Sequence, residues 1–187
     1  MSDKDLILDR NKLKETYDSA EAGNAEAQFV LGKHLGAIEP YFDPDGLGEG
    51  SLDDETIARL KDATTEIIPQ RDPGYWFTKA AQQGHAKAMT LNAIILSQKG
   101  NQAGYIEWLE KAAEKGDGQA MWLLAVHYDQ ASENNRENPL KRLTMLFSGD
   151  KNRSAAIEWY KKTISDGDDE EYKKMAQSNL SELTNEA

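Results

Sequence analysis

The residues of this chain that could do chemistry are carboxylates and three histidines, because the sequence contains no cysteine. Without thiols, the chain can form no disulfide, no thiolate zinc site and no cysteine nucleophile. Asp43, Asp45 and Asp54 have a spacing that loosely fits a calcium-binding loop, but Leu47 stands at the third ligand position and the closing glutamate is missing. We therefore expect no metal site and no cofactor, and a calcium-dependent module is the weakest alternative.

No other set of side chains has the spacing of a catalytic site. Serine, histidine and aspartate do not occur in the pattern of a nucleophilic hydrolase. The glycines from Gly46 to Gly50 precede a predicted helix, without the strand or the lysine that a phosphate-binding loop requires. His34 and His127 occupy the same position in two copies of the repeat described below, where packing or a surface role is expected in place of a metal pair. The sequence therefore predicts that the chain is not an enzyme.

The charge of the chain narrows the class of partner. The formal net charge is −11, and residues 37–72 hold ten acidic residues against Arg59, Lys61 and Arg71. Binding to nucleic acid or to an anionic membrane requires a basic face, so the favoured partner is another protein, and a basic one fits best.

Two further features bear on location. No run of eighteen apolar residues occurs, and the first residues are acidic where a secretory signal would be basic and then apolar. We expect a cytoplasmic protein without membrane insertion, or a periplasmic one if an export signal has been removed.

Four stretches resemble one another and define a repeat. The clearest copies surround Gly84 and Gly116, which are 32 residues apart, and weaker copies surround Gly23 and Gly167. Apolar residues recur at helical spacing before and after each glycine, which predicts a helix, a turn and an antiparallel second helix. One such hairpin cannot bury its apolar stripe alone. The sequence therefore predicts an all-α array in which neighbouring hairpins share a core.

We predict about four hairpins and two insertions within a single domain over residues 1–187. The hairpins are expected at about 5–36, 73–99, 102–131 and 152–185, and the insertions at about 37–72 and 132–151. In the first insertion, a loop rich in proline and glycine precedes an extra helix that ends near Ile67. The second insertion holds a short apolar helical piece from Leu140 to Phe147.

Large and small residues alternate in the repeat. The position eight residues before the glycine is Trp76, Trp108 or Trp159 in three copies, and alanine pairs precede both Gly84 and Gly116. A large ring opposite small side chains lets neighbouring helices approach closely while the ring fills the remaining gap. We therefore expect the tryptophans to lie in the core.

The stretch from Trp108 to Ala125 resembles the Sel1-like repeat, a relative of the tetratricopeptide repeat, in its tryptophan, its alanine pair, its glycine and its later small residues. The stretch from Gly48 to Asp54 is similar to the loop that joins repeats in that family. The end copies depart from the pattern, with Glu15 in place of the aromatic residue and Glu171 in place of a small one, as terminal repeats do. The resemblance implies a right-handed α-solenoid whose first helices line a concave face. It also implies a noncatalytic role as an adaptor or receptor for other proteins.

Side chains of the first helices that lie off the tryptophan and alanine stripe are our candidates for the partner-binding surface. They are Tyr75, Thr78, Lys79, Gln82, Glu107, Glu110, Lys111, Glu114, Glu158, Lys161, Lys162 and Ser165. The competing interpretation is a solvated face, because Glu107 with Lys111 and Glu158 with Lys162 have the spacing of ordinary helical ion pairs. The acidic loop from Glu39 to Asp54 is the second candidate, either as a surface that steers a basic partner or as a solubilising loop.

Three functions remain open from the sequence. The first is a noncatalytic protein–protein interaction module that binds through the concave helix face, the acidic insertion, or both. The second is a bacterial immunity protein that neutralises a secreted toxin, a use known for similar Sel1-like chains. The third is an enzyme or a calcium-dependent module. The ends of an array can also stack, so a homodimer is a further expectation, with Tyr41 and Phe42 as candidate anchors.

Overall fold

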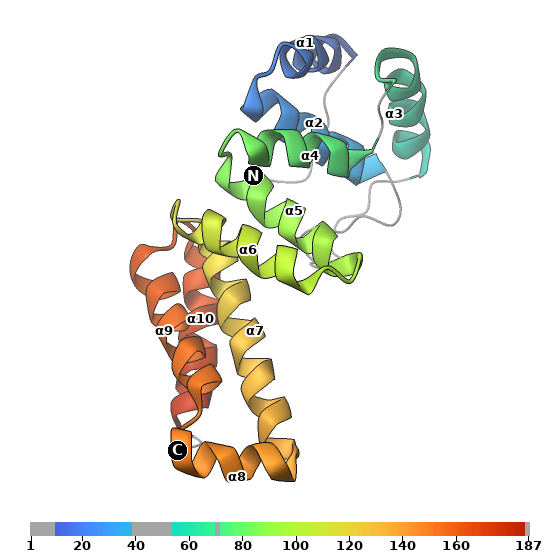
Figure 1. Cartoon of the computed structure of the whole chain (residues 1–187). Coiled ribbons are helices and arrows are strands. Elements are labelled where there is room, and N and C mark those ends of the chain that lie inside the picture. Colours follow the sequence, from blue (N-terminus) through green and yellow to red (C-terminus); the bar gives the residue numbers. More distant parts are fainter. Residues whose placement is uncertain (1–9, 39–53, 70–71, 186–187) are drawn as a thin grey trace. The chain divides into compact units, whose positions relative to one another are not determined.

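The computed structural model describes residues 10–38, 54–69 and 72–185, and the regular secondary structure within these ranges is entirely helical (Figure 1). The helices are α1 (Arg10–Glu21), α2 (Ala25–Ile38), α3 (Asp54–Ile67), α4 (Pro73–Gln82), α5 (Ala86–Gln98), α6 (Gln102–Ala113), α7 (Gly118–Glu137), α8 (Pro139–Ser148), α9 (Lys151–Asp166) and α10 (Glu170–Asn185). They belong to two compact units, which divide the chain between Asn101 and Gln102. The predicted all-α fold is confirmed.

The turn inside a hairpin has the same local structure in three copies. Gly23, Gly84 and Gly116 have φ angles of 96°, 90° and 88°, a left-handed conformation that costs energy for any residue with a Cβ. The N–H groups of the glycine and of the next residue donate to carbonyls in the last turn of the first helix. This pattern satisfies carbonyls that the end of a helix would otherwise leave without partners.

The residue after each of these glycines caps the second helix. Asn24, His85 and Asp117 accept hydrogen bonds from the backbone N–H groups three positions later, at 2.9, 3.2 and 2.8 Å. Because the glycine ends one helix and its neighbour starts the next, the connection is very short. The two helices are therefore held antiparallel and side by side.

In the first unit, α2 packs against α1 and α4, and α5 packs against α4. The side chains of Leu13, Leu31, Leu35, Ile68 and Trp76 form the core and are each at most 1% exposed. Ile68 directly follows α3, which also contacts α1 and α2. The predicted extra helix is thus present, and the end of the first insertion contributes to the core.

Gly32 allows α2 and α4 to approach closely. A Cβ added at Gly32 would lie 2.6 to 3.0 Å from three ring atoms of the buried Phe77. Ala93 and Ala125, which occupy the same repeat position, are fully buried as well. The predicted role of small residues on the second helix of each hairpin is therefore confirmed at these positions.

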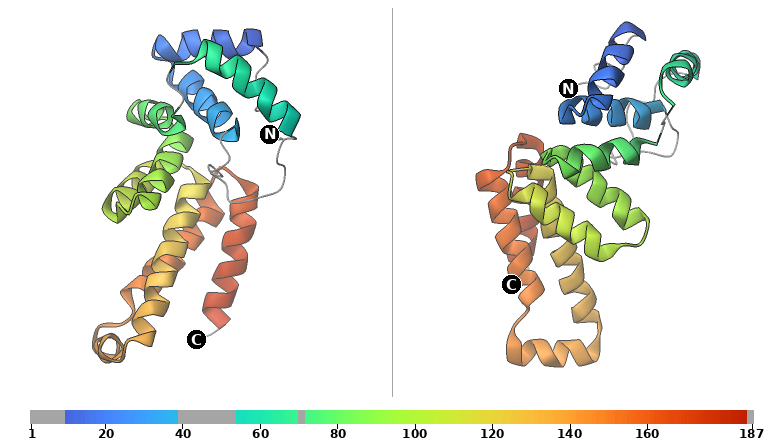
Figure 2. Two further views of the ribbon diagram at one scale, coloured as in Figure 1. Left: turned by 90° about the vertical axis from the view of Figure 1, so that its right-hand side faces the viewer. Right: turned by 45° about the horizontal axis from the view of Figure 1, so that its top comes forward.

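In the second unit, α7 is the central helix and packs against α6, α8, α9 and α10. The core contains Ala125, Ala156, Tyr160, Ala176 and Leu183. Two further views show α8 crossing from the end of α7 to the start of α9 (Figure 2). The hairpin of α9 and α10 is thereby linked to α7 through a helical connection.

Gly167 aligns with the repeat glycines but has a different role. Its φ angle is −61°, so it forms no left-handed turn. A Cβ at Gly167 would meet the carbonyl oxygen of Thr163 at 2.6 Å and the Cα of Gly118 at 3.2 Å. The next residue, Asp168, makes two hydrogen bonds to the other turn. Its backbone N–H donates to the Gly116 carbonyl at 3.2 Å, and its side-chain Oδ1 accepts from the Gly118 N–H at 3.0 Å. Glycine is therefore needed at 167 for the close contact between two turns.

One helix end differs from its prediction. Helix α7 continues to Glu137, although its predicted end is near residue 131. Polar residues such as Asn134 and Asn135 weaken a helix without ending it. The helix ends at Asn138 and Pro139, since the residue before a proline avoids helical backbone angles.

Several predictions fall on the parts of the chain that lie outside the described residues. These are the acidic loop with its calcium-loop carboxylates Asp43 and Asp45, the glycines from Gly46 to Gly50, and the anchors Tyr41 and Phe42. The right-handed sense of the array and a single domain over residues 1–187 stay predictions.

Candidate partner-binding surface

Helices α4, α6 and α9 are each the first helix of a repeat hairpin, and they share a pair of residues that can shape a binding surface. Each has a tryptophan followed three residues later by a lysine, and each lysine Nζ lies over the tryptophan ring. The distances from Nζ to the ring centroid are 5.5 Å for Lys79 over Trp76, 4.7 Å for Lys111 over Trp108 and 4.6 Å for Lys162 over Trp159. All three lie within the range of a cation–π interaction.

The three tryptophans differ in burial. Trp76 is fully buried, whereas Trp108 and Trp159 are only half-buried. The expectation that all three lie in the core is therefore confirmed for Trp76 and holds only in part for Trp159, which packs against the core of the second unit while partly exposed. Trp108 is partly exposed as well. The sequence does not distinguish the three, because each tryptophan is followed three residues later by a lysine, a spacing that places both side chains on one face of a helix.

On α4, the predicted residues form an aromatic and basic cluster. The Tyr75 ring meets Trp76 edge to face, with centroids 5.1 Å apart, and the Nζ of Lys79 lies 4.7 Å from the Tyr75 centroid. The Tyr75 side chain, as a hydrogen-bond partner, raises the pKa of Lys79 above its ordinary value. The ammonium group of Lys79 is thus held in place as a charged group.

The other two predicted residues of α4 differ from each other. Gln82 is exposed. The Thr78 hydroxyl is 2.9 Å from Oδ1 of the buried Asn92 on α5 and 2.7 Å from the Gly74 carbonyl. Thr78 therefore connects the two helices of its hairpin, while Gln82 is available to a partner.

On α6, the predicted residues form an acidic surface around one lysine. Nζ of Lys111 donates to Oε1 of Glu107 at 2.7 Å while it lies over Trp108. Glu110 is exposed on the same helix, and Glu114 is exposed in the turn that directly follows it. An exposed ion pair of this kind stabilises a helix by only about 0.3 to 0.5 kcal/mol. Its main effect is to keep the lysine ammonium between a ring and a carboxylate.

On α9, the predicted residues give a surface of the opposite charge. Glu158, Lys161, Lys162 and Ser165 are all exposed. Lys162 lies over Trp159, and the predicted ion pair with Glu158 is not formed. Two lysines against one glutamate leave this surface positive, in contrast to α6.

The two histidines that share a repeat position have separate structural roles. Nε2 of the buried His34 is 3.1 Å from the Thr64 hydroxyl of α3. His127 lies against Tyr105, with ring centroids 6.1 Å apart, and partial burial lowers its pKa. Within residues 10–38, 54–69 and 72–185, no group of three or more histidine, aspartate or glutamate side chains could hold a metal ion. None of the described helices is both long enough and apolar enough to cross a membrane.

The comparisons with known proteins agree with this architecture. The family model of the Sel1 repeat matches residues 75–85, 106–117 and 145–168, and each match includes most or all of one of the helices α4, α6 and α9. Three stretches of the chain therefore match the Sel1 repeat, which supports a Sel1-like repeat family, and the helices are those of a solenoid. No curated protein and no solved structure matches the chain. Sel1 repeats are generally protein–protein interaction modules, and the family is typically noncatalytic.

Proposed function

We propose that this chain is a noncatalytic adaptor or receptor that binds a partner protein through the first helices of its repeats. The observation that carries the proposal is the recurrence of a lysine held over a tryptophan ring on α4, α6 and α9. A long side chain that is already ordered loses less conformational entropy when a partner binds. The ordered lysines thus prepare the surface for binding. We also propose that residues 1–187 form one Sel1-like domain.

The charges on these helices support recognition of a particular partner. The exposed carboxylates of α6 favour a basic partner surface, and the lysines of α9 favour an acidic one. Complementary charges contribute mainly to the association rate and to the rejection of wrong partners. A partner that satisfies both helices must carry both kinds of charge in a matching arrangement.

The experiment is affinity capture with a charge-neutral variant of α6. In this variant, Glu107, Glu110 and Glu114 are replaced by glutamine, which keeps the size of each side chain. The matched control replaces the exposed Glu133, Glu171 and Glu182 by glutamine, so the net charge changes by the same amount at places in the second unit that lie off α6 and α9. The intact chain and both variants are used to capture partners from lysate and culture fluid of the source organism.

We expect the control to retain the partner and the α6 variant to lose most of it. Each captured partner is then purified, and its affinity is measured by calorimetry at low and high salt. Equal affinity of the two variants for the purified partner would move the binding site away from α6. In that case, a third variant with Asp43, Asp45 and Glu49 neutralised tests the acidic loop.

The alternative function is a bacterial immunity protein that neutralises a basic secreted toxin. The observation that favours it is the formal net charge of −11, together with the exposed carboxylates of α6. Under this proposal, the captured partner is a basic secreted enzyme, and adding the intact chain inhibits its activity. An acidic partner, or binding that does not weaken as salt rises, would exclude the immunity function.

A further inference from the structure

Helix α1 carries a tyrosine at a repeat position that the other copies use for candidate surface residues. Tyr17 lies six residues before Gly23. At the same offset, the other three copies have candidates for the partner-binding surface, namely Thr78, Glu110 and Lys161. Helix α1 supplied no candidate, because its copy of the repeat lacks the tryptophan. By its place in the repeat, Tyr17 extends the candidate surface onto α1.

The Tyr17 ring lies against the first helix of the next hairpin. It meets Trp76 of α4 edge to face, with ring centroids 6.1 Å apart, and Trp76 meets Tyr75 in the same way at 5.1 Å. Trp76 is fully buried, whereas both tyrosines are half-buried. A buried tryptophan therefore supports two tyrosine rings from two helices, and each of these rings keeps an exposed part.

The polar ends of these side chains also gather. Tyr75, as a hydrogen-bond partner, and the Glu21 carboxylate of α1 both raise the pKa of Lys79. Burial raises the pKa of Tyr17, and the carboxylates of Glu21 and Asp18 raise it further. Glu21 is therefore close to both Tyr17 and Lys79. We call the four residues Tyr17, Glu21, Tyr75 and Lys79 the tyrosine cluster.

The charges of the tyrosine cluster indicate which side chain it can take. Lys79 and Glu21 are close to one another, so the cluster has one charge of each sign and no net charge. A carboxylate from a partner would be repelled by Glu21 and by the exposed Asp18, and an ammonium or guanidinium group would be repelled by Lys79. An uncharged apolar side chain avoids both repulsions and covers the exposed parts of the rings.

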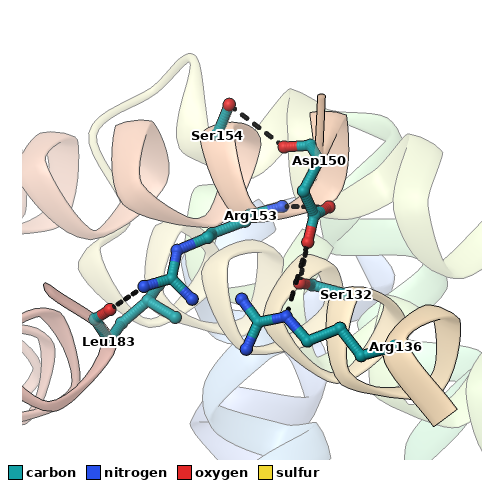
Figure 3. A network of polar contacts seen from close by, with 6 residues as sticks. All are labelled: Ser132, Arg136, Asp150, Arg153, Ser154 and Leu183. Atoms are coloured by element: carbon teal, nitrogen blue, oxygen red, sulfur yellow. Dashed lines mark hydrogen bonds and ion pairs between the residues drawn. The ribbon is translucent and has the colours of Figure 1, made fainter. Parts of the chain in front are cut away.

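A polar network in the second unit provides a contrast. The Asp150 carboxylate accepts hydrogen bonds from the hydroxyl of the buried Ser132 and, at 3.0 Å, from the Arg153 N–H (Figure 3). It also lies 3.8 Å from Nε of Arg136. Burial raises the pKa of Asp150, but these hydrogen bonds and the Arg136 charge outweigh burial and hold the pKa below its ordinary value. This network joins α7 to α9 within the protein, whereas the tyrosine cluster leaves ring surface exposed.

Tyrosine rings are favourable anchors for protein binding. They bury a large area with few rotatable bonds, and tyrosine is enriched among the residues that dominate the binding free energy of interfaces. The edge contacts with Trp76 order both rings before a partner arrives. Ordered side chains lose less entropy on binding, so Tyr17 and Tyr75 are prepared to form a contact.

We propose that Tyr17 and Tyr75 anchor the partner protein by taking one of its exposed apolar side chains, such as phenylalanine, tryptophan or leucine. The inference rests on the proposed function, because it concerns the same partner and the first helices of the repeats. It adds α1 to the binding surface and names the kind of side chain that is recognised. A second copy of the chain is disfavoured as the partner, since two molecules with a formal net charge of −11 repel one another.

The test uses a selected peptide as the probe. A library of random short peptides displayed on phage is selected on the full chain, and the peptide that binds most tightly is synthesised with a fluorescent label. Its association and dissociation rates are measured at low and high salt. We expect it to contain an aromatic residue or a leucine whose replacement by alanine weakens binding by about tenfold or more. Salt should have little effect, because screening acts on charges and not on an apolar contact.

Variants of the full chain then locate the site. The leucine variant, Tyr17→Leu with Tyr75→Leu, should raise the dissociation rate of the peptide by about tenfold or more and leave the association rate nearly unchanged, as expected for an anchor and not for a surface charge. Tyr17→Phe with Tyr75→Phe keeps both rings and should retain most of the binding. The matched control, Tyr128→Leu with Tyr172→Leu, changes two half-buried tyrosines of the second helices α7 and α10 and should bind normally. Urea unfolding verifies that each variant is folded in the assay.

Other outcomes would overturn the proposal. A library that yields no binding peptide, or a peptide that binds the leucine variant as tightly as the intact chain, would show that the tyrosines are not an anchor. Self-association that the leucine variant loses in analytical ultracentrifugation would assign the cluster to a second copy of this chain. Partner capture separates this inference from the proposed function: loss of the partner by the α6 variant but not by the leucine variant would reject the anchor alone, and retention by both would reject both.

Discussion

Replacing Gly32 by alanine tests the close approach of α2 and α4 directly. The added Cβ would lie 2.6, 2.8 and 3.0 Å from three atoms of the Phe77 ring. Phe77 is fully buried, and its ring lies 6.2 Å from that of Phe29, measured between centroids. The ring therefore has little room to move, and the extra methyl group must strain the contact.

Two opposing effects determine the magnitude of this change. Alanine is a better helix former than glycine, which stabilises an interior helical position by about 1 kcal/mol. Overpacking of a core costs about 1 to 3 kcal/mol, and contacts of this length with a buried ring belong at the upper end. We therefore expect Gly32→Ala to lower the free energy of unfolding of the first unit by about 1 to 2 kcal/mol.

The assay is a double-mutant cycle with Phe77→Leu, a substitution that removes the ring atoms involved. Urea unfolding is followed by tryptophan fluorescence, to which the buried Trp76 contributes, and by circular dichroism. Each single variant should be destabilised, but in the Phe77→Leu background the alanine should cost nothing or stabilise the protein. Strictly additive effects, or a stabilising Gly32→Ala on its own, would refute the packing argument.

Three further predictions concern the second unit. Gly167→Ala should lower the free energy of unfolding by about 1 to 3 kcal/mol, because its Cβ would meet the Thr163 carbonyl; no loss in urea unfolding would contradict this contact. Gly116→Ala should cost only about 1 kcal/mol, since its surroundings are open and only the positive φ opposes a side chain; the same titration measures it. The folded pKa of Asp150 is lowered, so its ionised form stabilises the fold above the unfolded pKa near 3.9, and this contribution disappears as the pH falls through the folded pKa. Asp150→Asn, which can still cap α9, should therefore be less stable by about 1 to 2 kcal/mol at pH 7 and nearly equal to the parent in strong acid; a difference that persists at low pH would rule out the charge as its cause.

The helices and their turns could be predicted from the sequence because their causes are local. Gly84 and Gly116 provide the left-handed turn, and the next residue provides the cap, so a few adjacent positions determine where one helix ends and the next begins. The extra helix α3 was predictable for a similar reason, since prolines and glycines mark its surroundings. The end of α7 was harder, because the asparagines in it are compatible with either a helix or a loop.

The features that could not be predicted depend on contacts between distant parts of the chain. Nothing around Gly167 distinguishes a glycine that turns the chain from one that lies against Gly118. The half-buried state of Trp108 depends on its neighbours in space, so the repeat pattern alone assigned it to the core. Twelve candidate surface residues could be chosen by helical periodicity, but the engagement of Thr78 with Asn92 follows from the packing of α4 against α5.

The self-contained turns also have a consequence for how such a chain changes during evolution. At Gly23, Gly84 and Gly116, the hydrogen bonds that shape the turn all come from within a few residues. A whole hairpin can therefore be duplicated or deleted without loss of its own geometry, and only the joints to its neighbours must be rebuilt. An engineer could use the same property and insert a further copy of residues 85–116 after Gly116, which would lengthen the array by one hairpin.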